Sequence, residues 1–234
     1  MHSKIADLIV EVPEAGSMAP RCQEYLIQSD IPADIVISEQ EYRYEKYPQD
    51  SQLVAYMDSG FQFYRQLLNF DGMMLHASAV SIDNRAYLFS GPCGTGKSTH
   101  THLWKQVFGE AAQIFNDDKP ALRRLDGKWF AYGTPWCGKD GINQNRKVPL
   151  AGICFLKQAP ENAIRRLSPQ EALKRVIHQT PHRFKSADGL DMLLDHVDKL
   201  VRDIPIFEFE NRPEPEAAAL SYETMRKAAQ EVGL

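Results

Sequence analysis

The sequence predicts a mixed α/β fold of α+β character, in which a largely antiparallel sheet surrounds one central helix. Three observations support this prediction. Several β-rich runs are joined by short turns, such as Asp126-Gly127, a dipeptide typical of type I′ hairpin turns. A glycine-rich loop, residues 91–98, stands between one such run and a helical segment. Other segments carry apolar residues at helical rather than alternating spacing.

The first third of the chain is predicted to contain two strands and two helices. Residues 9–12 are expected to form a strand, residues 19–27 a short helix, and residues 34–45 an extended ladder. After Pro48 the apolar residues recur at helical spacing, which predicts an amphipathic helix. Its buried stripe is expected to consist of Leu53, Met57, Phe61, Tyr64 and Leu68.

The middle of the chain changes to a period of two. Residues 74–82 and 86–90 are predicted to form a hairpin, and residues 98–108 the helix that follows the glycine-rich loop. A strand over 112–116 precedes a second hairpin, made by residues 121–124 and 128–132.

The last third is expected to begin with a buried strand over 151–156. Ser168-Pro169-Gln170-Glu171 then has the pattern of a capping box with proline in the first turn, which marks a helix start. A helix over 190–201, a strand over 205–210 and a closing helix over 215–232 complete the prediction.

One domain covering residues 1–234 is expected, because the sequence shows no internal repeat and no low-complexity linker. Within it, residues 1–48 form a divergent N-terminal portion, 49–212 the core, and 213–234 the C-terminal helix.

The charge balance narrows the classes of partner. The chain of 234 residues carries 27 basic and 31 acidic side chains, a formal net charge of −4, so no basic excess indicates a nucleic acid or an anionic membrane surface as partner. No segment approaches the roughly 20 apolar residues of a membrane span, and the N-terminus lacks a leader-like apolar region. We therefore expect a cytoplasmic protein. Its four cysteines are expected to be reduced, since none has zinc-site spacing.

Residues 91–98 match the phosphate-loop pattern G-x-x-x-x-G-K-[ST] through Gly91, Gly96, Lys97 and Ser98, between a predicted strand and a predicted helix. In such a loop the backbone amides and the helix N-terminus hold phosphates, the lysine reaches the β- and γ-phosphates, and the hydroxyl ligates Mg²⁺. ATP and Mg²⁺ are therefore the expected cofactors. The residues predicted to bind the nucleotide are Gly91, Pro92, Cys93, Gly94, Thr95, Gly96, Lys97, Ser98 and Thr99.

Two adjacent carboxylates, Asp117 and Asp118, follow the predicted strand 112–116. Neighbouring side chains on an extended chain point in different directions, so one carboxylate can hold Mg²⁺ while the other accepts a proton from a hydroxyl. The sequence predicts a magnesium site that uses Ser98 and one carboxylate of this pair. Lys119 is expected to contact phosphate or to lie on the surface.

A polar loop over residues 133–146 carries two further cations, Lys139 and Arg146. Both are predicted to contribute to nucleotide binding by neutralising charge on the γ-phosphate, with the loop closing over the site. The alternative is a long connection held in place by Trp136.

His76, the 91–98 loop and Asn116-Asp117-Asp118 together resemble the catalytic domain of HPr kinase/phosphorylase and, more distantly, ATP-dependent phosphoenolpyruvate carboxykinase. Over roughly residues 50–215 the chain is even more similar overall to a bacterial group of HPr-kinase-like proteins, through the runs LHASAV, GTGKSTHTHLW, NDDKPAL and GTPWCGK.

The resemblance implies a fold of that type, a catalytic set of His76, Lys97, Asp117 and Asp118, and His76 as a partner of either aspartate. It further implies Asp117 as the base and Asp118 as the metal ligand, and it admits a homo-oligomer. Thr99 departs from the family, which has an acidic residue at that position.

The expected function is an ATP- and Mg²⁺-dependent kinase that transfers the γ-phosphate to a hydroxyl. The acceptor is left open between a serine of a protein or peptide and a small alcohol such as free serine. An alternative is a nucleotide-binding regulatory protein or degenerate kinase without turnover, and another is carboxykinase-like chemistry on a small organic acid. The sequence also leaves open the choice among ATP, GTP and pyrophosphate, a reverse phosphorylase reaction and the oligomeric state.

Overall fold

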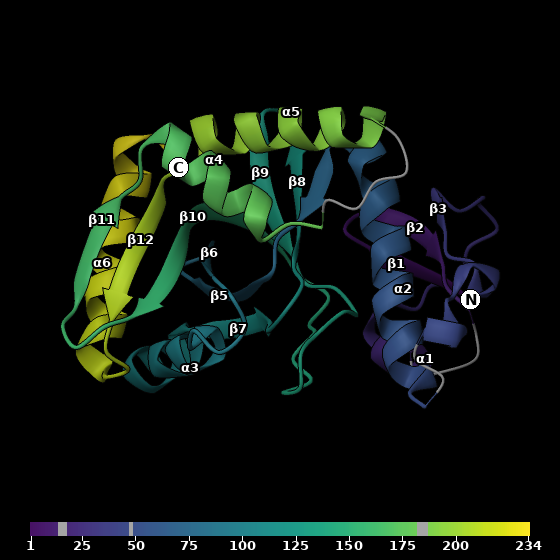
Figure 1. The fold of residues 1–234 in the computed structure, drawn as a ribbon, viewed down its shortest axis with the longest axis horizontal. Coiled ribbons are helices and arrows are strands. Elements are labelled where there is room, and N and C mark those ends of the chain that lie inside the picture. The colour runs from purple at the N-terminus through teal and green to yellow at the C-terminus, as the bar shows by residue number, and fades with distance from the viewer. Residues whose placement is uncertain (14–17, 47–48, 182–186) are drawn as a thin grey trace.

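A curved mixed sheet organises most of the chain (Figure 1). The computed structural model describes residues 1–13, 18–46, 49–181 and 187–234, so Pro48 lies outside the described residues. Within these ranges the sheet has nine strands. They are β4 (Gly72–Met74), β5 (Ala77–Ile82), β6 (Arg85–Ser90), β7 (Gln113–Asn116), β8 (Ala121–Leu125), β9 (Lys128–Tyr132), β10 (Lys147–Gln158), β11 (Ala163–Arg166) and β12 (Ile206–Asn211).

The long strand β10 joins the two halves of this sheet. Its first residues pair antiparallel with β9, and its later residues pair parallel with β6 on one side and β12 on the other. The remaining pairs of the sheet, β4 with β8, β8 with β9, β5 with β6, β5 with β7 and β11 with β12, are antiparallel. The predicted fold class, mixed α/β with a largely antiparallel sheet, is therefore confirmed.

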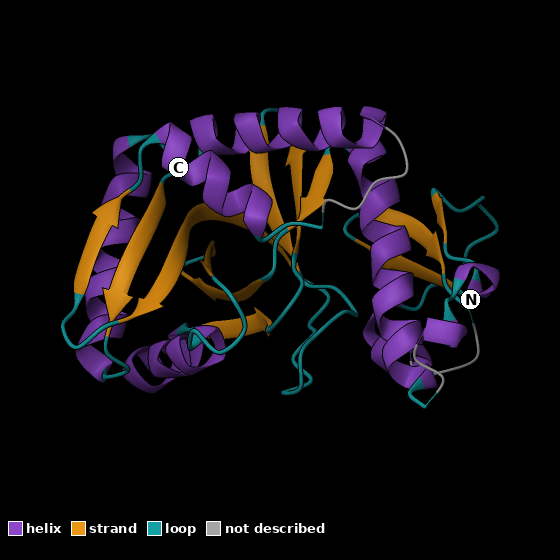
Figure 2. Cartoon of the chain, viewed as in Figure 1, coloured by secondary structure: helices purple, strands orange, loops and turns teal. Residues whose placement is uncertain are grey.

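Helices cover both faces of the sheet (Figure 2). Helices α4 (Pro169–His178) and α5 (Ala187–Asp203) pack on one face, while α3 (Lys97–Phe108) and α6 (Pro215–Glu231) pack on the other. Strand β6 shows why both faces are apolar. Leu88 belongs to the core beneath α4 and α5, and its neighbours Tyr87 and Phe89 belong to the core beneath α3 and α6. Alternate side chains thus enter opposite cores.

The N-terminal residues form a small second sheet of β1 (His2–Ile5), β2 (Leu8–Glu11) and β3 (Ile35–Val36), with the short helix α1 (Met18–Arg21). Helix α2 (Ser51–Leu67) lies between this sheet and the large one, as Figure 1 shows. Short 3₁₀ turns cover Gln23–Tyr25, Glu39–Glu41, Tyr44–Lys46, Leu68–Phe70 and Gly109–Ala111. A third apolar core joins the N-terminal sheet to α2.

The predicted ladder over residues 34–45 is wrong, because only Ile35–Val36 is a strand. At and after the end of this strand, backbone groups of Val36 and Ser38 bond to glutamine side chains of α2. Gln62 accepts from the Ser38 amide and donates to the Ser38 carbonyl, both at 2.9 Å, and Gln66 donates to the Val36 carbonyl at 2.9 Å. The helix predicted over 19–27 is also shorter, since α1 ends at Arg21.

The buried stripe predicted for α2 is partly wrong. Tyr64 and Leu68 are buried, but Leu53 and Met57 are 41% and 49% exposed. Contacts on more than one side of the helix explain the difference. Phe63 stacks on Trp136 with ring centroids 4.7 Å apart, while the buried Asp58 carboxylate accepts from the Arg43 backbone amide at 2.8 Å. A single helical period does not reveal two buried faces.

Several local predictions are confirmed. Asp126 and Gly127 both have positive φ, 49° and 79°, as a type I′ turn requires, and Asp83 and Asn84 form a similar turn between β5 and β6. The capping box of Ser168 and Glu171 starts α4. The run 74–82 is interrupted at Leu75 and His76, so it forms two strands, β4 and β5. Within the described ranges, no helix combines the length and the apolar character needed to cross a membrane.

We predict that Gly133→Ala destabilises the fold by about 3 kcal/mol, because its new Cβ would stand 1.9 Å from the Gln144 carbonyl oxygen and 2.9 Å from that of Phe115. Gly127→Ala serves as the control. Its Cβ meets only the end of the Arg124 side chain at 4.0 Å, and it costs about 1 kcal/mol for the positive φ. Urea unfolding of both variants tests which of them is destabilised more. Equal midpoints would show that the Gly133 backbone yields without cost.

Candidate functional site

The glycine-rich loop, residues 91–98, connects the end of β6 to the start of α3. Gly96 is the N-cap of α3 at φ 94°, a conformation that L side chains rarely adopt. Lys97 is buried, and its ammonium donates to the carbonyls of Gly91 at 2.9 Å and Pro92 at 3.2 Å. Ser98 follows in the first turn of the helix, where the backbone amides have no acceptor within the helix. The loop therefore presents a cation, a hydroxyl and backbone amides together.

Lys97 and Asp118 interact across the site. Burial lowers the pKa of the Lys97 ammonium, and attraction to Asp118 partly offsets that shift. Strands β6 and β7 both pair antiparallel with β5 and end beside its first residues, so the two sequence motifs leave the sheet at the same edge.

The break between β4 and β5 positions His76. Its backbone amide donates to the Gln179 carbonyl at 2.9 Å, and the next amide, that of Ala77, donates to the Asp118 carbonyl at 3.0 Å. The imidazole Nε2 then lies 3.2 Å from Asp118 Oδ1, and Nδ1 lies 3.1 Å from Gln179 Oε1. The two alternatives left by the sequence are thereby resolved, since His76 contacts Asp118 and not Asp117.

Asp118 is held by three donors. Besides His76, the Tyr56 hydroxyl donates to Oδ2 at 2.6 Å, and Lys119 forms an ion pair with the same oxygen. Lys119 also donates to the Tyr56 hydroxyl at 2.7 Å. Burial alone would raise the pKa of Asp118, but the His76 hydrogen bond and the Lys119 charge outweigh it and hold that pKa well below its usual range. Asp118 is therefore ionised at neutral pH.

Asp117 points instead to the loop between β9 and β10. Its Oδ1 accepts from the Gly138 amide at 2.6 Å, and its Oδ2 accepts from the Asp140 amide at 3.2 Å. Burial raises the pKa of Asp117, and the Gly138 hydrogen bond only partly opposes this shift. Two neighbouring carboxylates thus have pKa values displaced in opposite directions, a pattern that separates acid–base groups from charge-bearing groups in active sites.

A pocket of about 630 Å³ lies beside the glycine-rich loop. Its size is that of small-molecule and cofactor sites. Its walls are the loop, the end of β10, one side of α4, and Glu208 of β12. The lining residues are Gly91, Pro92, Cys93, Gly94, Thr95, Phe155, Leu156, Lys157, Gln158, Lys174, Arg175, His178, Gln179 and Glu208.

Two charges of this pocket are already compensated. Arg175 pairs with Glu208, and Lys157 pairs with Glu210 at 2.6 Å. Gln158 donates to the Gly94 carbonyl at 3.0 Å and so ties the loop to β10.

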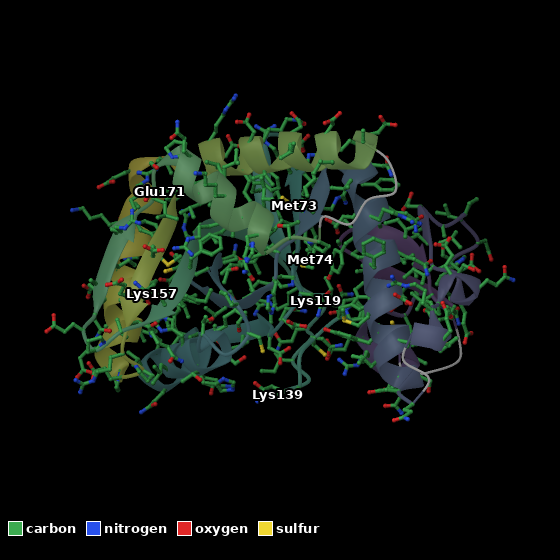
Figure 3. The ribbon with its side chains drawn as sticks, in the orientation of Figure 1. Met73, Met74, Lys119, Lys139, Lys157 and Glu171 are labelled. Carbon is green, nitrogen blue, oxygen red and sulfur yellow. The ribbon has the colours of Figure 1, made fainter. Side chains whose placement is uncertain are left out.

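The remaining predicted residues do not all come to this place. Lys139 is exposed at the rim of a second pocket, next to Asp118 rather than beside the glycine-rich loop. Arg146 donates to the Gln113 side chain at the beginning of β7, the end of the strand opposite to Asp117. Thr99 is exposed on α3. In Figure 3, Lys119 and Lys139 lie between α3 and α2, whereas Lys157 lies near β12.

The loop over 133–146 is anchored at its ends. Gly133 donates to the Arg146 carbonyl at 3.0 Å, and Gln144 donates to the Phe115 carbonyl at 3.0 Å. Trp136 is fully buried and donates to the Ser59 hydroxyl at 2.9 Å. This packing is the connection role weighed above, while the exposed residues Lys139–Asp140–Gly141 remain beside the site.

The oxygen donors near the loop suit magnesium bound together with a nucleotide. Among the described residues, no three His, Cys, Asp or Glu side chains gather as a metal cluster. Mg²⁺ commonly takes one or two protein oxygens and completes its shell with phosphate and water oxygens. A hydroxyl from Ser98 and a carboxylate from Asp118 meet that requirement.

Two contacting residues have no signal in the sequence. Tyr56 lies within α2, outside the stripe predicted from helical spacing, and Gln179 follows the last turn of α4. Both touch the acidic pair or its histidine. Neither belongs to a recognisable motif, because each reaches the site through tertiary packing.

A scan against protein-family models and a search of curated proteins found no match. Among solved structures, the chain is similar to the HPr(Ser) kinase/phosphatase from Coxiella burnetii. The two are 12% identical with a TM-score of 0.39, and the alignment covers 68% of this chain and 91% of the other.

We predict that Asp118→Asn lowers stability at pH 7 by about 1–3 kcal/mol, because Lys119, Tyr56 and His76 lose a charged partner. The folded pKa of Asp118 lies below the unfolded value of about 3.9. Its stabilising contribution is therefore complete above that value and is lost as the pH falls toward the folded pKa.

Asp117 affects the stability of the fold in the opposite direction. Its pKa is raised in the folded state, so its ionisation lowers that stability as the pH rises. Asp117→Asn should therefore lose less stability at pH 7 than Asp118→Asn. Thermal melts of both variants between pH 7 and pH 3 measure this difference, which should shrink as the pH falls. A larger loss for Asp117→Asn at neutral pH would contradict the assigned directions.

Proposed function

We propose that the protein is an ATP- and Mg²⁺-dependent kinase that transfers the γ-phosphate to a hydroxyl group. The observation that carries the proposal is that the glycine-rich loop after β6 and the acidic pair after β7 leave the sheet at the same edge, on either side of β5. Asp118 acts electrostatically on Lys97 and is bonded to His76. Positioning and electrostatic stabilisation are the main requirements of phosphoryl transfer, and these groups supply both.

The pocket beside the loop is the proposed nucleotide site. Its wall on α4 carries Lys174 and Arg175, and Gln179 at the end of that helix reaches His76. The nucleotide's phosphates would lie over the loop amides, where the start of α3 adds positive potential. The γ-phosphate would then point toward Asp117 and Asp118.

Magnesium, when bound with the nucleotide, would be held by Ser98 and Asp118 and would neutralise charge on the phosphate oxygens. Lys97 would leave the Gly91 and Pro92 carbonyls and contact the phosphates. These carbonyls hold the ammonium at the site in advance.

Asp117 is the proposed base. Its raised pKa makes it the better proton acceptor of the two aspartates, and two of the four lone-pair directions of its carboxylate are used by loop amides. The acceptor oxygen forms a bond to the γ-phosphorus, the bond between that phosphorus and the bridging oxygen breaks, and ADP leaves. The proton of the acceptor hydroxyl passes to Asp117. His76 and Lys119 keep Asp118 ionised beside it.

Lys97→Ala is expected to weaken Mg·ATP binding by about tenfold or more, because a charge-assisted contact to phosphate is worth about 1.5–3 kcal/mol. Isothermal titration and thermal shift with Mg·ATP measure the loss. Lys105→Ala is the matched control, an exposed lysine on the same helix. If both variants are stabilised equally by Mg·ATP, Lys97 is not the phosphate-binding lysine and the proposed function fails.

Asp117→Asn should reduce phosphoryl transfer by about 10²-fold or more while Mg·ATP affinity stays close to that of the parent. Slow ATP hydrolysis under single-turnover conditions gives the rate. Asp191→Asn, at an exposed aspartate of α5, is the control. Asp118→Asn should instead weaken the Mg²⁺ dependence of binding. If Asp117→Asn weakens the Mg²⁺ dependence of binding and Asp118→Asn reduces the rate, the two roles are exchanged. Unchanged rates in both variants would refute the kinase proposal.

A further inference from the structure

A second pocket, of about 530 Å³, opens on another side of Asp118. Its wall includes residues from α1, α2 and the loop between β9 and β10, namely Arg21, Tyr56, Asp118, Cys137, Gly138 and Lys139. We propose that this pocket binds the phosphoryl acceptor, and that the acceptor carries an anionic group close to its hydroxyl. The proposal rests on the proposed kinase function and names the substrate class of that site.

The pocket reaches one carboxylate of the acidic pair and comes close to the other. Asp118 lines it directly. Asp117 lies immediately behind Gly138, because a Cβ at Gly138 would stand 3.1 Å from Asp117 Oδ2 and 3.4 Å from the Asp118 Cβ. A side chain at position 138 would therefore press on Asp117, so a glycine fits this position. A hydroxyl at the floor of the pocket would therefore come close to the proposed base and to the proposed metal ligand.

The two pockets lie at opposite ends of one chain of hydrogen bonds. Gln179 lines the nucleotide pocket and bonds His76, His76 bonds Asp118, and Asp118 lines the second pocket. Phosphoryl transfer needs the attacking and leaving oxygens roughly in line on either side of the phosphorus. Separate entrances for nucleotide and acceptor satisfy that geometry.

The second pocket carries more positive than negative charge once its ion pair is taken into account. Asp118 is already paired with Lys119, and Asp50 accepts from the Leu53 amide as the N-cap of α2. Within the described part of the chain, no carboxylate forms an ion pair with Arg21 or Lys139. The pocket therefore has two cations, Arg21 and Lys139, and one carboxylate outside an ion pair, that of Asp50, which caps α2.

Arg21 is held in a defined position. One guanidinium nitrogen donates to the Cys137 carbonyl at 3.0 Å and contacts its sulfur at 2.9 Å, and the guanidinium carbon lies 5.1 Å from the centre of the Tyr56 ring. A planar guanidinium fixed in this way retains further N–H donors for a carboxylate or phosphate. Lys139, exposed at the rim, adds a second positive charge that can follow the ligand.

The volume of about 530 Å³ suits a small molecule or a short stretch of a peptide. The shared chemistry is thus a hydroxyl with a carboxylate nearby, from a free hydroxy acid or from a serine next to an acidic residue. The N-terminal portion of the chain gains a role from this assignment, because α1 supplies Arg21.

The test measures ADP release at saturating Mg·ATP with matched pairs of probes. The pairs are L-serine and L-serinamide, glycerate and glyceramide, and two peptides in which aspartate or asparagine follows serine. We expect the acidic member to accelerate ADP release at least about tenfold more than its amide, since a charge-assisted contact is lost. Acceleration by the free acids identifies a small-molecule acceptor, and acceleration by the acidic peptide alone identifies a polypeptide.

Variants locate the effect. Arg21→Gln and Lys139→Gln should each raise the KM of the acidic probe about tenfold, and Arg21→Lys should restore part of that loss. Lys128→Gln, at an exposed lysine of the β8–β9 hairpin, should leave the KM of the acidic probe and that of its amide unchanged. Because Arg21 also contacts Cys137, the exposed Lys139 keeps the test valid if Arg21→Gln fails to fold.

Two results would overturn the inference: equal acceleration by acids and amides, or no acceleration by any probe in protein that binds Mg·ATP. A change of KM in the variants that is equal for acid and amide would overturn it as well. Loss of the proposed function itself looks different, since Mg·ATP then fails to bind or binds without dependence on Lys97. The two failures are thereby separated.

Discussion

The compensation of one carboxylate, Asp118, determines how the site is assembled. An ionised aspartate removed from water costs several kcal/mol unless donors and cations surround it. Here Lys119 supplies the charge, Tyr56 of α2 donates a hydroxyl hydrogen bond, and His76 enters from the break between β4 and β5. His76 in turn engages Gln179 after α4. Elements far apart in the sequence are therefore held at one point, and the glycine-rich loop faces that point through Lys97.

The parts of this arrangement that the sequence predicts are local. The glycine-rich loop, the turn at Asp126-Gly127 and the capping box at Ser168 each depend on a few consecutive residues, whose backbone preferences and hydrogen bonds are short-range. The parts that it does not predict depend on tertiary partners. Residues 37–45 do not form a strand, and after the Ile37 amide donates to the Glu11 carbonyl, Gln62 of α2 bonds both backbone groups of Ser38.

The pairing of His76 shows the same limit of prediction from the sequence within the site. A histidine and two adjacent aspartates can be recognised from their order, but which aspartate the imidazole contacts depends on register. The hydrogen bond from the Ala77 amide to the Asp118 carbonyl places the two chains side by side and fixes that register. Tyr56 could not be recognised from the sequence for another reason. Periodicity assigns one buried face to α2, whereas the helix is buried on more than one side and Tyr56 lies outside the assigned face.

The division between Asp117 and Asp118 follows from what lies next to each of them. Like charges on adjacent residues raise one another's pKa, so the buried Asp117 and the half-buried Asp118 cannot both remain readily ionised without added cations. Lys119, the next residue in the chain, and His76 stabilise the charge on Asp118 alone. Asp117 receives only backbone amides, which compensate its burial incompletely. The asymmetry needed for one carboxylate to hold charge and the other to take a proton is thus built by the neighbours of the pair, and not by the carboxylates themselves.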